Sequence, residues 1–432
     1  MMKKIKIALL GLGNVGTGVW KIFQMNKDEI EKRSGYEVEI SKILVRDKKK
    51  NRGLDVPKEI ITTNFKDILG DEDIKIVVEV IGGIEPAKSY ILNAIKNKKH
   101  IVTANKMLLA TKGDELFKVA DENGVMFRYE ASVAGGIPII NGINESLTAN
   151  KIENLYGIVN GTTNYILSKM DLEKVSFKTA LKEAQVKGYA EADPTSDVDG
   201  FDSQYKLAIL AALSFGTQVD VSNVYREGIT NISSLDIEYA RELGYKIKLL
   251  AIVKNYNNKL ELRVHPTMVP EEHPLAAVYD SFNAIFLKGN AVGELMFYGR
   301  GAGDLPTGSA VVSDIIAILR EDVEGENKIP VVKNNLWKKE FKEMSEVTCR
   351  YYIRATVIDE PGVLGEITTV FGENKVSLRS VIQRGRRHSG QYVTLVFETY
   401  ITKETNIISS IDSLYELKSV NKIDNLIRIE EF

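Results

Sequence analysis

The sequence has 432 residues, 44% of them hydrophobic and 27% charged, which excludes an intrinsically disordered chain and leaves room for about two to four domains. Its formal net charge of −2 creates no field that would attract nucleic acid or an anionic membrane, and no apolar run reaches the roughly 18 residues of a membrane-spanning helix. The single cysteine, Cys349, excludes an internal disulfide, so the composition favours a cytoplasmic protein with a small-molecule partner.

The first part of the chain alternates short β-branched runs with amphipathic stretches. Lys6 interrupts the apolar run at the N-terminus, so we interpret this run as a first strand rather than a signal peptide. The predicted strands are Ile5–Leu10, Glu37–Val45, Ile74–Val80, His100–Ala104 and Val125–Tyr129. The predicted helices between them are Val15–Met25, Pro86–Lys98 and Asp114–Asn123. This alternation predicts an α/β, Rossmann-type dinucleotide-binding domain over residues 1–130.

A glycine-rich motif separates the first predicted strand from the first predicted helix. It fits the pattern G-x-G-x-x-G and comprises Gly11, Leu12, Gly13, Asn14, Val15 and Gly16. In such motifs the first glycine permits a tight turn, the second lets the backbone approach a pyrophosphate, and the third allows close packing of helix on strand. We interpret it as a dinucleotide site, and a purely structural glycine turn is the alternative.

The end of the second predicted strand bears on the choice of cofactor. Asp47 would accept a hydrogen bond from the 2′-hydroxyl of NAD, whereas Arg46 and Lys48 would hold the 2′-phosphate of NADP. These residues leave both cofactors open, with a slight preference for NADP.

Residues 131–320 read as a second, α+β domain, with a helix around Asp202–Leu213 and strands near Lys259–Thr267 and Asn283–Gly289. Reduction of a carbonyl needs a proton donor, and histidine or cysteine often takes part in such chemistry. Cys349 lies far in sequence from the glycine motif. The four histidines have the settings of structural residues; they are His100, His265, His273 and His388. A lysine or tyrosine is therefore the expected acid.

Two lysines have settings that suit acid–base chemistry. Lys206 precedes the apolar segment 207–213, where desolvation would lower its pKa, and Asp202 lies one helical turn earlier on the same face. A surface ion pair at a helix start is the alternative. Lys106 follows a strand end, at the sheet edge where open α/β sheets bind ligands, and a solvated lysine is the alternative there.

Two polar segments complete the set of candidate binding groups. Residues 187–200 concentrate acidic side chains ahead of Lys206, which suits an ammonium-bearing substrate. Their spacing does not match a calcium-binding EF-hand, and a solvated acidic turn is the alternative. Asn160–Asn164 offers amide and hydroxyl donors for a carboxylate, although a turn with a helix cap fits equally well.

The C-terminal part reads as a separate unit. The charged stretch 321–347 is the predicted linker, and residues 348–432 follow in the order strand, helix, strand, strand, helix, strand. This order is typical of a ferredoxin-like domain. Because every candidate catalytic group lies earlier in the chain, deletion after about Lys342 is expected to preserve the chemistry.

Taken together, these segments resemble the homoserine dehydrogenase family over about residues 1–320. The shared segments are Gly11–Gly16, Thr103–Lys106, Glu130–Pro138, Asn160–Asn164 and Lys187–Pro194, the last followed by Asp202 and Lys206. The resemblance implies reduction of L-aspartate 4-semialdehyde to L-homoserine with NADPH or NADH, toward threonine, methionine and isoleucine. It also implies that residues 131–320 form a catalytic and dimerisation domain, which binds the substrate.

The resemblance assigns roles to individual residues. Lys206 is similar to the family's proton donor, and Lys106 to the lysine beside nicotinamide and substrate. Glu191 is similar to the carboxylate that receives the substrate amine, while Asp202 and Asp197 would support the lysine and its water network. Further implied contacts are Gly161, Thr162 and Tyr189 for the substrate, and Thr103, Lys106 and Gly303 for the cofactor.

The Glu130–Pro138 turn resembles the family's site for a sodium or potassium ion. The implied ligands are mainly the backbone carbonyls of Val133, Gly135 and Ile137, with Glu130 as a further contributor. The segment Gly299–Thr307 resembles the family's loop near the nicotinamide, and the helix predicted over 308–320 would complete the nucleotide domain.

The C-terminal unit resembles an ACT domain, because Asp359–Gly365 falls at the first strand-to-helix turn, where such domains bind amino acids. Threonine is the favoured effector, and a role in assembly alone is the alternative. The resemblance implies the monofunctional form of the enzyme, as a homodimer or homotetramer. The competing hypotheses are another amino-acid-linked dehydrogenase and an amino-acid sensor with a relict nucleotide fold.

Overall fold

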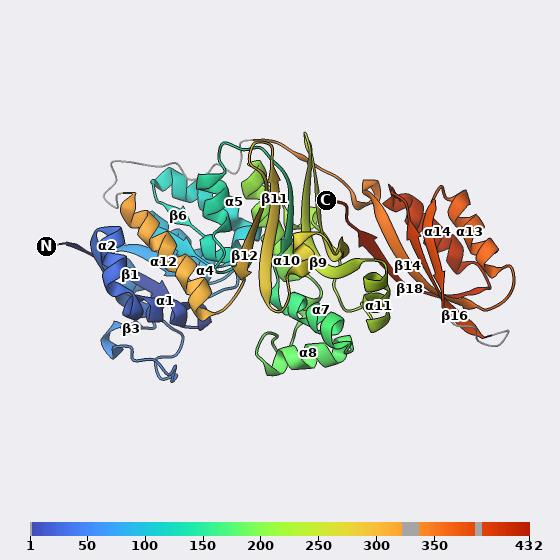
Figure 1. Ribbon diagram of the computed structural model, residues 1–432. Helices are drawn as coiled ribbons and strands as arrows, with labels where there is room; N and C mark the ends of the chain where they lie inside the picture. The colour runs from blue at the N-terminus through green and yellow to red at the C-terminus, as the bar shows by residue number, and fades with distance from the viewer. Residues whose placement is uncertain (1, 322–336, 385–390) are drawn as a thin grey trace. The chain divides into compact units, whose positions relative to one another are not determined.

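The computed structural model describes residues 2–321, 337–384 and 391–432 (Figure 1). It divides into two compact units. The first unit comprises Met1–Glu153, Tyr205–Asn223 and Asn283–Lys338, and the second comprises Asn154–Gln204, Val224–Phe282 and Lys339–Phe432.

A parallel sheet forms the centre of the first unit. Among the described residues, six strands lie in the order β3-β2-β1-β4-β5-β6, and all neighbours pair in parallel. They are β1 (Lys3–Leu10), β2 (Tyr36–Leu44), β3 (Ile61–Thr62), β4 (Ile74–Glu79), β5 (His100–Thr103) and β6 (Phe127–Arg128). This is the strand order of a Rossmann fold, so the predicted fold class is confirmed. Such sheets bind ligands where the order reverses, here between β1 and β4.

Helices cover this sheet because each turns an apolar face toward it. They are α1 (Asn14–Met25), α2 (Lys27–Ser34), α3 (Lys66–Leu69), α4 (Ala87–Lys96), α5 (Lys106–Asn123) and α12 (Asp304–Arg320). Helix α12 packs along α1 in one apolar cluster with the sheet. Glycines allow the close approach, since a Cβ on Gly308 would lie 2.7 Å from the carbonyl carbon of Gly18. The first unit also contains the short helix α6 (Ile139–Asn141) and the paired strands β11 (Phe282–Gly289) and β12 (Gly293–Arg300).

The second unit contains a long sheet with the strand order β7-β9-β10-β18-β14-β16-β15. The strands are β7 (Ile152–Ile158), β9 (Tyr245–Tyr256), β10 (Lys259–Pro270), β18 (Val420–Ile429), β14 (Thr348–Ile358), β16 (Tyr392–Thr399) and β15 (Leu378–Gln383). Shorter strands pair at its side: β8 (Tyr225–Arg226) and β13 (Glu340–Phe341) with β10, and β17 (Thr402–Lys403) with β14. Its helices are α7 (Gly161–Glu173), α8 (Phe177–Val186), α9 (Thr195–Val198), α11 (Ser234–Glu242), α13 (Val363–Glu373) and α14 (Glu404–Tyr415).

The C-terminal segment has the predicted order, with β14, α13, β15, β16, α14 and β18 along the chain. Its own core lies between the four main strands and the two helices. The prediction of a ferredoxin-like element order is therefore confirmed. The predicted linker, 321–347, falls mostly outside the described residues, and its described end forms β13 and a 3₁₀ turn at Met344–Glu346.

This segment also pairs with the rest of the second unit. Strand β18 pairs in parallel with β10, with Thr267 opposite Arg428 and Met268 opposite Ile429. The C-terminal segment (residues 339–432) therefore continues the sheet of residues 154–282, and we call their contact the junction. The sequence could not reveal this pairing, because β10 and β18 are separated by about 150 residues and each reads as an ordinary strand.

Buried charges span the junction. Arg263 on β10 is completely buried and binds Glu261 at 2.8 Å and Glu430 at 2.6 Å. Arg428 on β18 binds Glu404 and, at 2.9 Å, Glu227. Because a charge left without its partner in such a place is strongly destabilising, these pairs tie the C-terminal segment to the rest of the unit.

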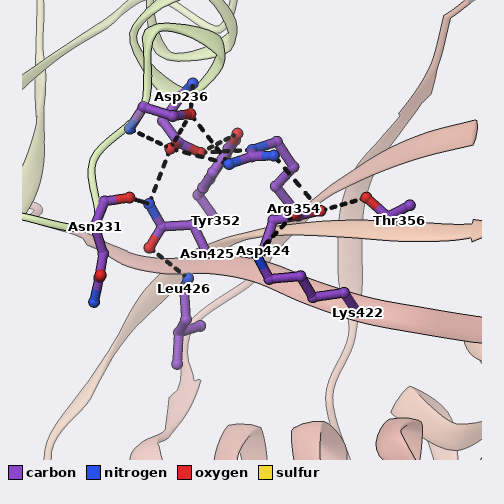
Figure 2. A network of polar contacts seen from close by, with 10 residues as sticks. Asn231, Asp236, Tyr352, Arg354, Thr356, Lys422, Asp424, Asn425 and Leu426 are labelled. Carbon is purple, nitrogen blue, oxygen red and sulfur yellow. Dashed lines mark hydrogen bonds and ion pairs between the residues drawn. The ribbon is translucent and has the colours of Figure 1, made fainter. Parts of the chain in front are cut away.

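A third buried pair lies near α11 (Figure 2). The carboxylate of Asp236, which helps to cap α11, accepts hydrogen bonds from Arg354 Nε at 2.8 Å and from the Tyr352 hydroxyl at 3.1 Å. Asn425 Nδ2 donates to the same carboxylate at 3.0 Å. We call Asp236, Tyr352, Arg354 and Asn425 the Arg354 network. Three of its four members come from the C-terminal segment.

Across the residues that the structure describes, no helix is both long enough and apolar enough to cross a bilayer.

Candidate active site

The glycine motif forms the turn between β1 and α1 in the first unit. Gly11 has φ +104, and a Cβ there would lie 2.9 Å from the carbonyl oxygen of Val80. Gly16 packs directly on Gly11, again leaving no room for a side chain. Gly13, in contrast, faces open space at the N-terminal end of α1. The backbone there is accessible to an anion, and the helix N-terminus favours negative charge.

The residues after β2 are exposed. Asp47 Oδ1 accepts a hydrogen bond from the Lys49 amide at 2.7 Å, so part of its carboxylate is used by the local turn. Arg46 and Lys48 lie on the surface on either side of it.

The segment Thr103–Lys106 is organised by a residue that the sequence analysis missed. Glu79, at the end of β4, is fully buried and accepts a hydrogen bond from the Thr103 hydroxyl at 2.7 Å. Asn105 then accepts from the Leu108 amide at 3.2 Å and donates to the Gly83 carbonyl at 2.6 Å. This N-cap makes α5 begin at Lys106 instead of the predicted Asp114, and it places Lys106 at the carboxyl end of β5. A strand-end Glu carries no pattern of its own, which is why it was overlooked.

Two segments that the resemblance assigned separately contact each other in the first unit. The Gly136 amide donates to the Arg300 carbonyl at 3.1 Å, and a Cβ on Gly135 would lie 2.5 Å from the Gly301 carbonyl oxygen. The Glu130–Pro138 turn therefore packs on the loop that leads through Gly303 into α12. Lys21 on α1 binds Asp304 at 2.7 Å and fixes the end of this loop.

Glu130 occupies a buried position behind the turn. Its two carboxylate oxygens accept hydrogen bonds from the amides of Ile140 at 2.9 Å and Asn141 at 2.7 Å, and its own amide donates to Asp314 at 2.8 Å. Burial raises the pKa of Glu130 although these backbone donors oppose the rise. Burial, and then the charge of Glu130, raises the pKa of Asp314 as well. The two carboxyl groups thus form a pair that does not ionise independently.

In the second unit, Asn160 connects the polar segments that the sequence analysis singled out. Its Nδ2 donates to Asp197 at 2.7 Å and to Asp202 at 2.9 Å. Its Oδ1 accepts from the Thr163 amide at 2.8 Å and so caps α7. One buried amide therefore holds both carboxylates, although they come from either side of the turn between α9 and α10 (Phe201–Phe215).

The acidic segment lies close to the start of α7. The Thr162 hydroxyl donates to the Tyr189 carbonyl at 2.6 Å. The side chain of Glu191 is exposed, and its carbonyl accepts from Gln185 at 3.1 Å. The structure thus brings Thr162 and Tyr189 together, and it leaves the Glu191 carboxylate facing solvent.

A buried lysine that the sequence analysis missed supports the same helix start. Gly161 lies against residues 278–282, since a Cβ there would be 2.7 Å from the Ser281 carbonyl oxygen. Asn164 donates to the carbonyls of Asp280 at 3.0 Å and Phe282 at 3.1 Å. Lys248 on β9 donates to the Val278 carbonyl, and burial lowers its pKa to about 7. A lysine inside an apolar strand pattern reads as a surface residue, which is why it was overlooked.

Helix α10 carries both Asp202 and Lys206. They lie four residues apart in the helix, with exposed fractions of 3% and 8%. Such burial does not fit the solvated surface ion pair that was the alternative interpretation.

The histidines and the cysteine have structural settings. His100 accepts a hydrogen bond from the Met126 amide, His265 is fully buried against Arg263, and His273 stacks on Phe432. His388 lies outside the described residues. Cys349 is buried, and burial raises the pKa of its thiol to about 11, which does not suit a nucleophile.

Comparisons with known proteins agree with this geometry. Residues 11–130 match the family model of the homoserine dehydrogenase NAD-binding domain, residues 138–316 match that of homoserine dehydrogenase, and residues 351–409 match that of the ACT domain. The homoserine dehydrogenase of Bacillus subtilis is 43% identical over 433 residues, with 99% of each chain covered.

Solved structures give the same result. The crystal structure of a homoserine dehydrogenase from Thiobacillus denitrificans superposes with a TM-score of 0.93 at 42% identity, covering 100% of this chain and 99% of that one. A hyperthermophilic archaeal homoserine dehydrogenase mutant in complex with NADPH covers 72% of this chain and 97% of its own, with a TM-score of 0.59 at 26% identity. With its dinucleotide turn, its Asn160-centred carboxylates and its ACT segment, the chain belongs to the homoserine dehydrogenase family of oxidoreductases.

Proposed function

We propose that this chain catalyses the reversible, NAD(P)H-dependent reduction of L-aspartate 4-semialdehyde to L-homoserine, in the pathway toward threonine, methionine and isoleucine. The observation that carries the proposal is the pair of buried side chains on α10, with Asp202 one turn before Lys206. A dinucleotide fold alone is compatible with many substrates, whereas this pair would supply a proton donor for an alkoxide.

Lys206 is the proposed proton donor. The ammonium Nζ would deliver a proton to the carbonyl oxygen as hydride arrives at the carbon, and Asp202 would orient it. Asn160 holds Asp202 and Asp197 at 2.9 and 2.7 Å, so both carboxylates are fixed before substrate arrives. Lys106, at the start of α5, is the proposed second lysine beside the reacting atoms.

The substrate's α-amino group is assigned to Glu191, whose exposed carboxylate is open to an ammonium ion. Gly161, Thr162 and Tyr189 would complete the substrate contacts. Thr162 and Tyr189 are already joined by a hydrogen bond of 2.6 Å, which gives this part of the site a fixed shape.

The residues of the first unit fit a nicotinamide dinucleotide. The backbone from Gly11 to Gly16 would face the pyrophosphate, where Gly13 leaves the space open, and Thr103 and Gly303 would line the cofactor further on. When bound, the nicotinamide supplies or accepts the hydride. Exposed Arg46 and Lys48 favour NADP over NAD, as does the NADPH complex of the archaeal relative.

A monovalent cation, sodium or potassium, is assigned to the Glu130–Pro138 turn. Ala134 and Gly135 both have positive φ, 55 and 52, so successive peptide groups change direction there. The proposed donors are the backbone carbonyls of Val133, Gly135 and Ile137, as the family resemblance implies. Glu130 would contribute chiefly by fixing the turn, because its carboxylate already caps α6.

The ACT segment is assigned a regulatory role with threonine as effector, and we expect a homodimer or homotetramer. A reducing cytoplasmic compartment suits the buried thiol of Cys349. The turn at Asp359–Gly365 offers backbone groups at Gly362, which has φ +98.

Absorbance of reduced nicotinamide tests the activity, with homoserine and either oxidised cofactor. Lys206→Ala should lower turnover by about 10²–10⁴-fold while cofactor binding, measured by fluorescence, stays unchanged. Lys182→Ala, at an exposed position on α8, is the matched control and should behave like the parent. No reduced nicotinamide from the parent enzyme would refute the reaction, and near-parental turnover of Lys206→Ala would refute the proton donor.

A further inference from the structure

A buried carboxylate lies at the carboxyl end of β4, where the strand order of the parallel sheet reverses. The side chain of Glu79 is completely buried. Its Oε1 accepts hydrogen bonds from the amides of Ile81 at 2.8 Å and Gly82 at 3.1 Å, and its Oε2 accepts from the Thr103 hydroxyl at 2.7 Å. All three donors are uncharged, so an apolar residue would fill this position without the cost of burying a charge. This cost points to a role beyond packing.

The hydrogen bonds of Glu79 continue to the start of α5. The hydroxyl of Thr103 accepts from the Asn105 amide at 3.1 Å, and Asn105 Nδ2 donates to the Gly83 carbonyl at 2.6 Å. Asn105 Oδ1 also caps α5 through the Leu108 amide. We call Glu79, Thr103 and Asn105 the Glu79 clamp. It joins the loop that follows β4, residues 80–86, to the segment that places Lys106.

The Glu79 clamp lies on one side of the glycine motif. In the sheet order β3-β2-β1-β4-β5-β6, the glycine motif follows β1, residues 46–48 follow β2, and the clamp follows β4 and β5. A dinucleotide binds across this reversal point, so with its adenosine ribose near β2 its nicotinamide half extends toward β4 and β5. Gly82 and Gly83 have φ +81 and +74, and a Cβ on either would meet nothing within 4 Å. The clamp therefore holds a loop that presents bare backbone on the nicotinamide side.

We propose that Glu79 is a positioning residue for the nicotinamide half of the cofactor. Through the Glu79 clamp it fixes the backbone at Gly82 and Gly83 and the start of α5 at Lys106 in one arrangement. Without the carboxylate, the two amides and the Thr103 hydroxyl lose their common acceptor, and the two segments are free to move independently. A dinucleotide would then have to order them when it binds, which lowers its affinity. This inference rests on the proposed cofactor site.

Calorimetric titration of the full chain tests the proposal by comparing a dinucleotide with its adenosine half. The probe pairs are NADPH with adenosine 2′,5′-bisphosphate, and NADH with AMP. Glu79→Leu removes the acceptor, so it should weaken dinucleotide binding at least about tenfold and change binding of the adenosine half less than about twofold. A general disturbance of the nucleotide fold would instead weaken both members of a pair equally. Glu79→Gln keeps an oxygen for the two amides and should bind the dinucleotide within about threefold of the parent.

Two further variants make the comparison independent of a single substitution. Asn105→Ser keeps a residue that caps helices well, but its side chain is too short to reach the Gly83 carbonyl. It should show the same selective loss, including where Glu79→Leu does not fold. Glu72→Leu, at an exposed position before the amino end of β4, is the matched control and should bind every probe as the parent does. Circular dichroism establishes that each variant is folded.

The possible results separate this inference from the proposed cofactor site. Equal losses for the dinucleotide and its adenosine half, or no loss, in the folded Glu79→Leu and Asn105→Ser variants would overturn the positioning role and leave the cofactor site standing. A loss in Glu79→Gln as large as that in Glu79→Leu would assign the effect to the charge and would also overturn it. Binding of neither dinucleotide to the parent would overturn the cofactor site together with this inference.

Discussion

Replacing Arg354 by methionine tests whether the C-terminal segment is an integral part of the second unit. Arg354 gives Asp236 two hydrogen bonds, at 2.8 and 3.2 Å, and the carboxylate is fully buried. Methionine keeps the apolar stem and removes the charge. Asp236 would then be a buried anion without a counterion, which costs about 3–5 kcal/mol of unfolding free energy. The hydrogen-bond donors of Ser233, Tyr352 and Asn425 remain, so we expect the free energy of unfolding to fall by about 3 kcal/mol.

The loss of unfolding free energy in Arg354→Met should depend on pH. Burial raises the pKa of Asp236, but hydrogen bonding and the charge of Arg354 outweigh it, and the pKa lies below its usual value. In the parent protein the ionised carboxylate therefore stabilises the fold above its unfolded pKa of about 3.9, and this contribution is lost as the pH falls through the folded pKa. In the variant, burial is no longer opposed by Arg354, so the folded pKa rises above the unfolded one. The difference between the two proteins should be largest at pH 7 and smaller near pH 4.

Urea denaturation followed by circular dichroism measures the difference, and hydrogen exchange at α11 locates it. Arg33→Met is the matched control, because Arg33 binds Glu29 at 2.6 Å on the surface and its loss should cost at most about 0.5 kcal/mol. A loss for Arg354→Met as small as that of the control, or one that grows as the pH falls, would refute this reasoning.

Three further predictions concern the activity. Glu191→Gln should raise the KM for homoserine more than that for the cofactor, because only the charge for the substrate amine is removed, and an unchanged homoserine affinity in direct titration would contradict the assignment. Replacing Arg46 and Lys48 by alanine should weaken NADPH binding more than NADH binding, and equal losses would show that neither side chain contacts the 2′-phosphate. Deletion of residues 343–432 should abolish soluble, active protein, because it strips Arg263 and Asp236 of their buried partners; an active truncated enzyme in the same assays would show the junction to be dispensable.

Local sequence patterns were sufficient to predict the nucleotide-binding fold. Alternating β-branched runs and the motif Gly11–Gly16 determine strand, turn and helix within a few residues of each other, so the sequence predicted β1, α1 and the parallel sheet correctly. The predicted start of α5 was wrong, because Asn105 caps this helix only when Gly83 and Thr103 lie beside it.

Interactions between residues that lie far apart in the sequence could not be predicted from it. Asn160 bridges Asp197 and Asp202 across about 40 residues, and sequence spacing showed only a polar turn and an acidic cluster. The buried pairs across the junction could not be predicted for the same reason, since nothing near Arg354 or Arg428 in the sequence indicates that their partners, Asp236 and Glu227, lie more than 100 residues away.

The free-energy cost of breaking the buried ion pairs limits how regulation can work in this unit. A tenfold effect of an amino acid on substrate affinity requires about 1.4 kcal/mol of coupling, and a ligand can shift an equilibrium only by its differential affinity for the two states. Separating the C-terminal segment would instead break the Asp236–Arg354 pair, at about 3–5 kcal/mol. An effector that binds the C-terminal segment would therefore have to act while the Asp236–Arg354 pair stays intact.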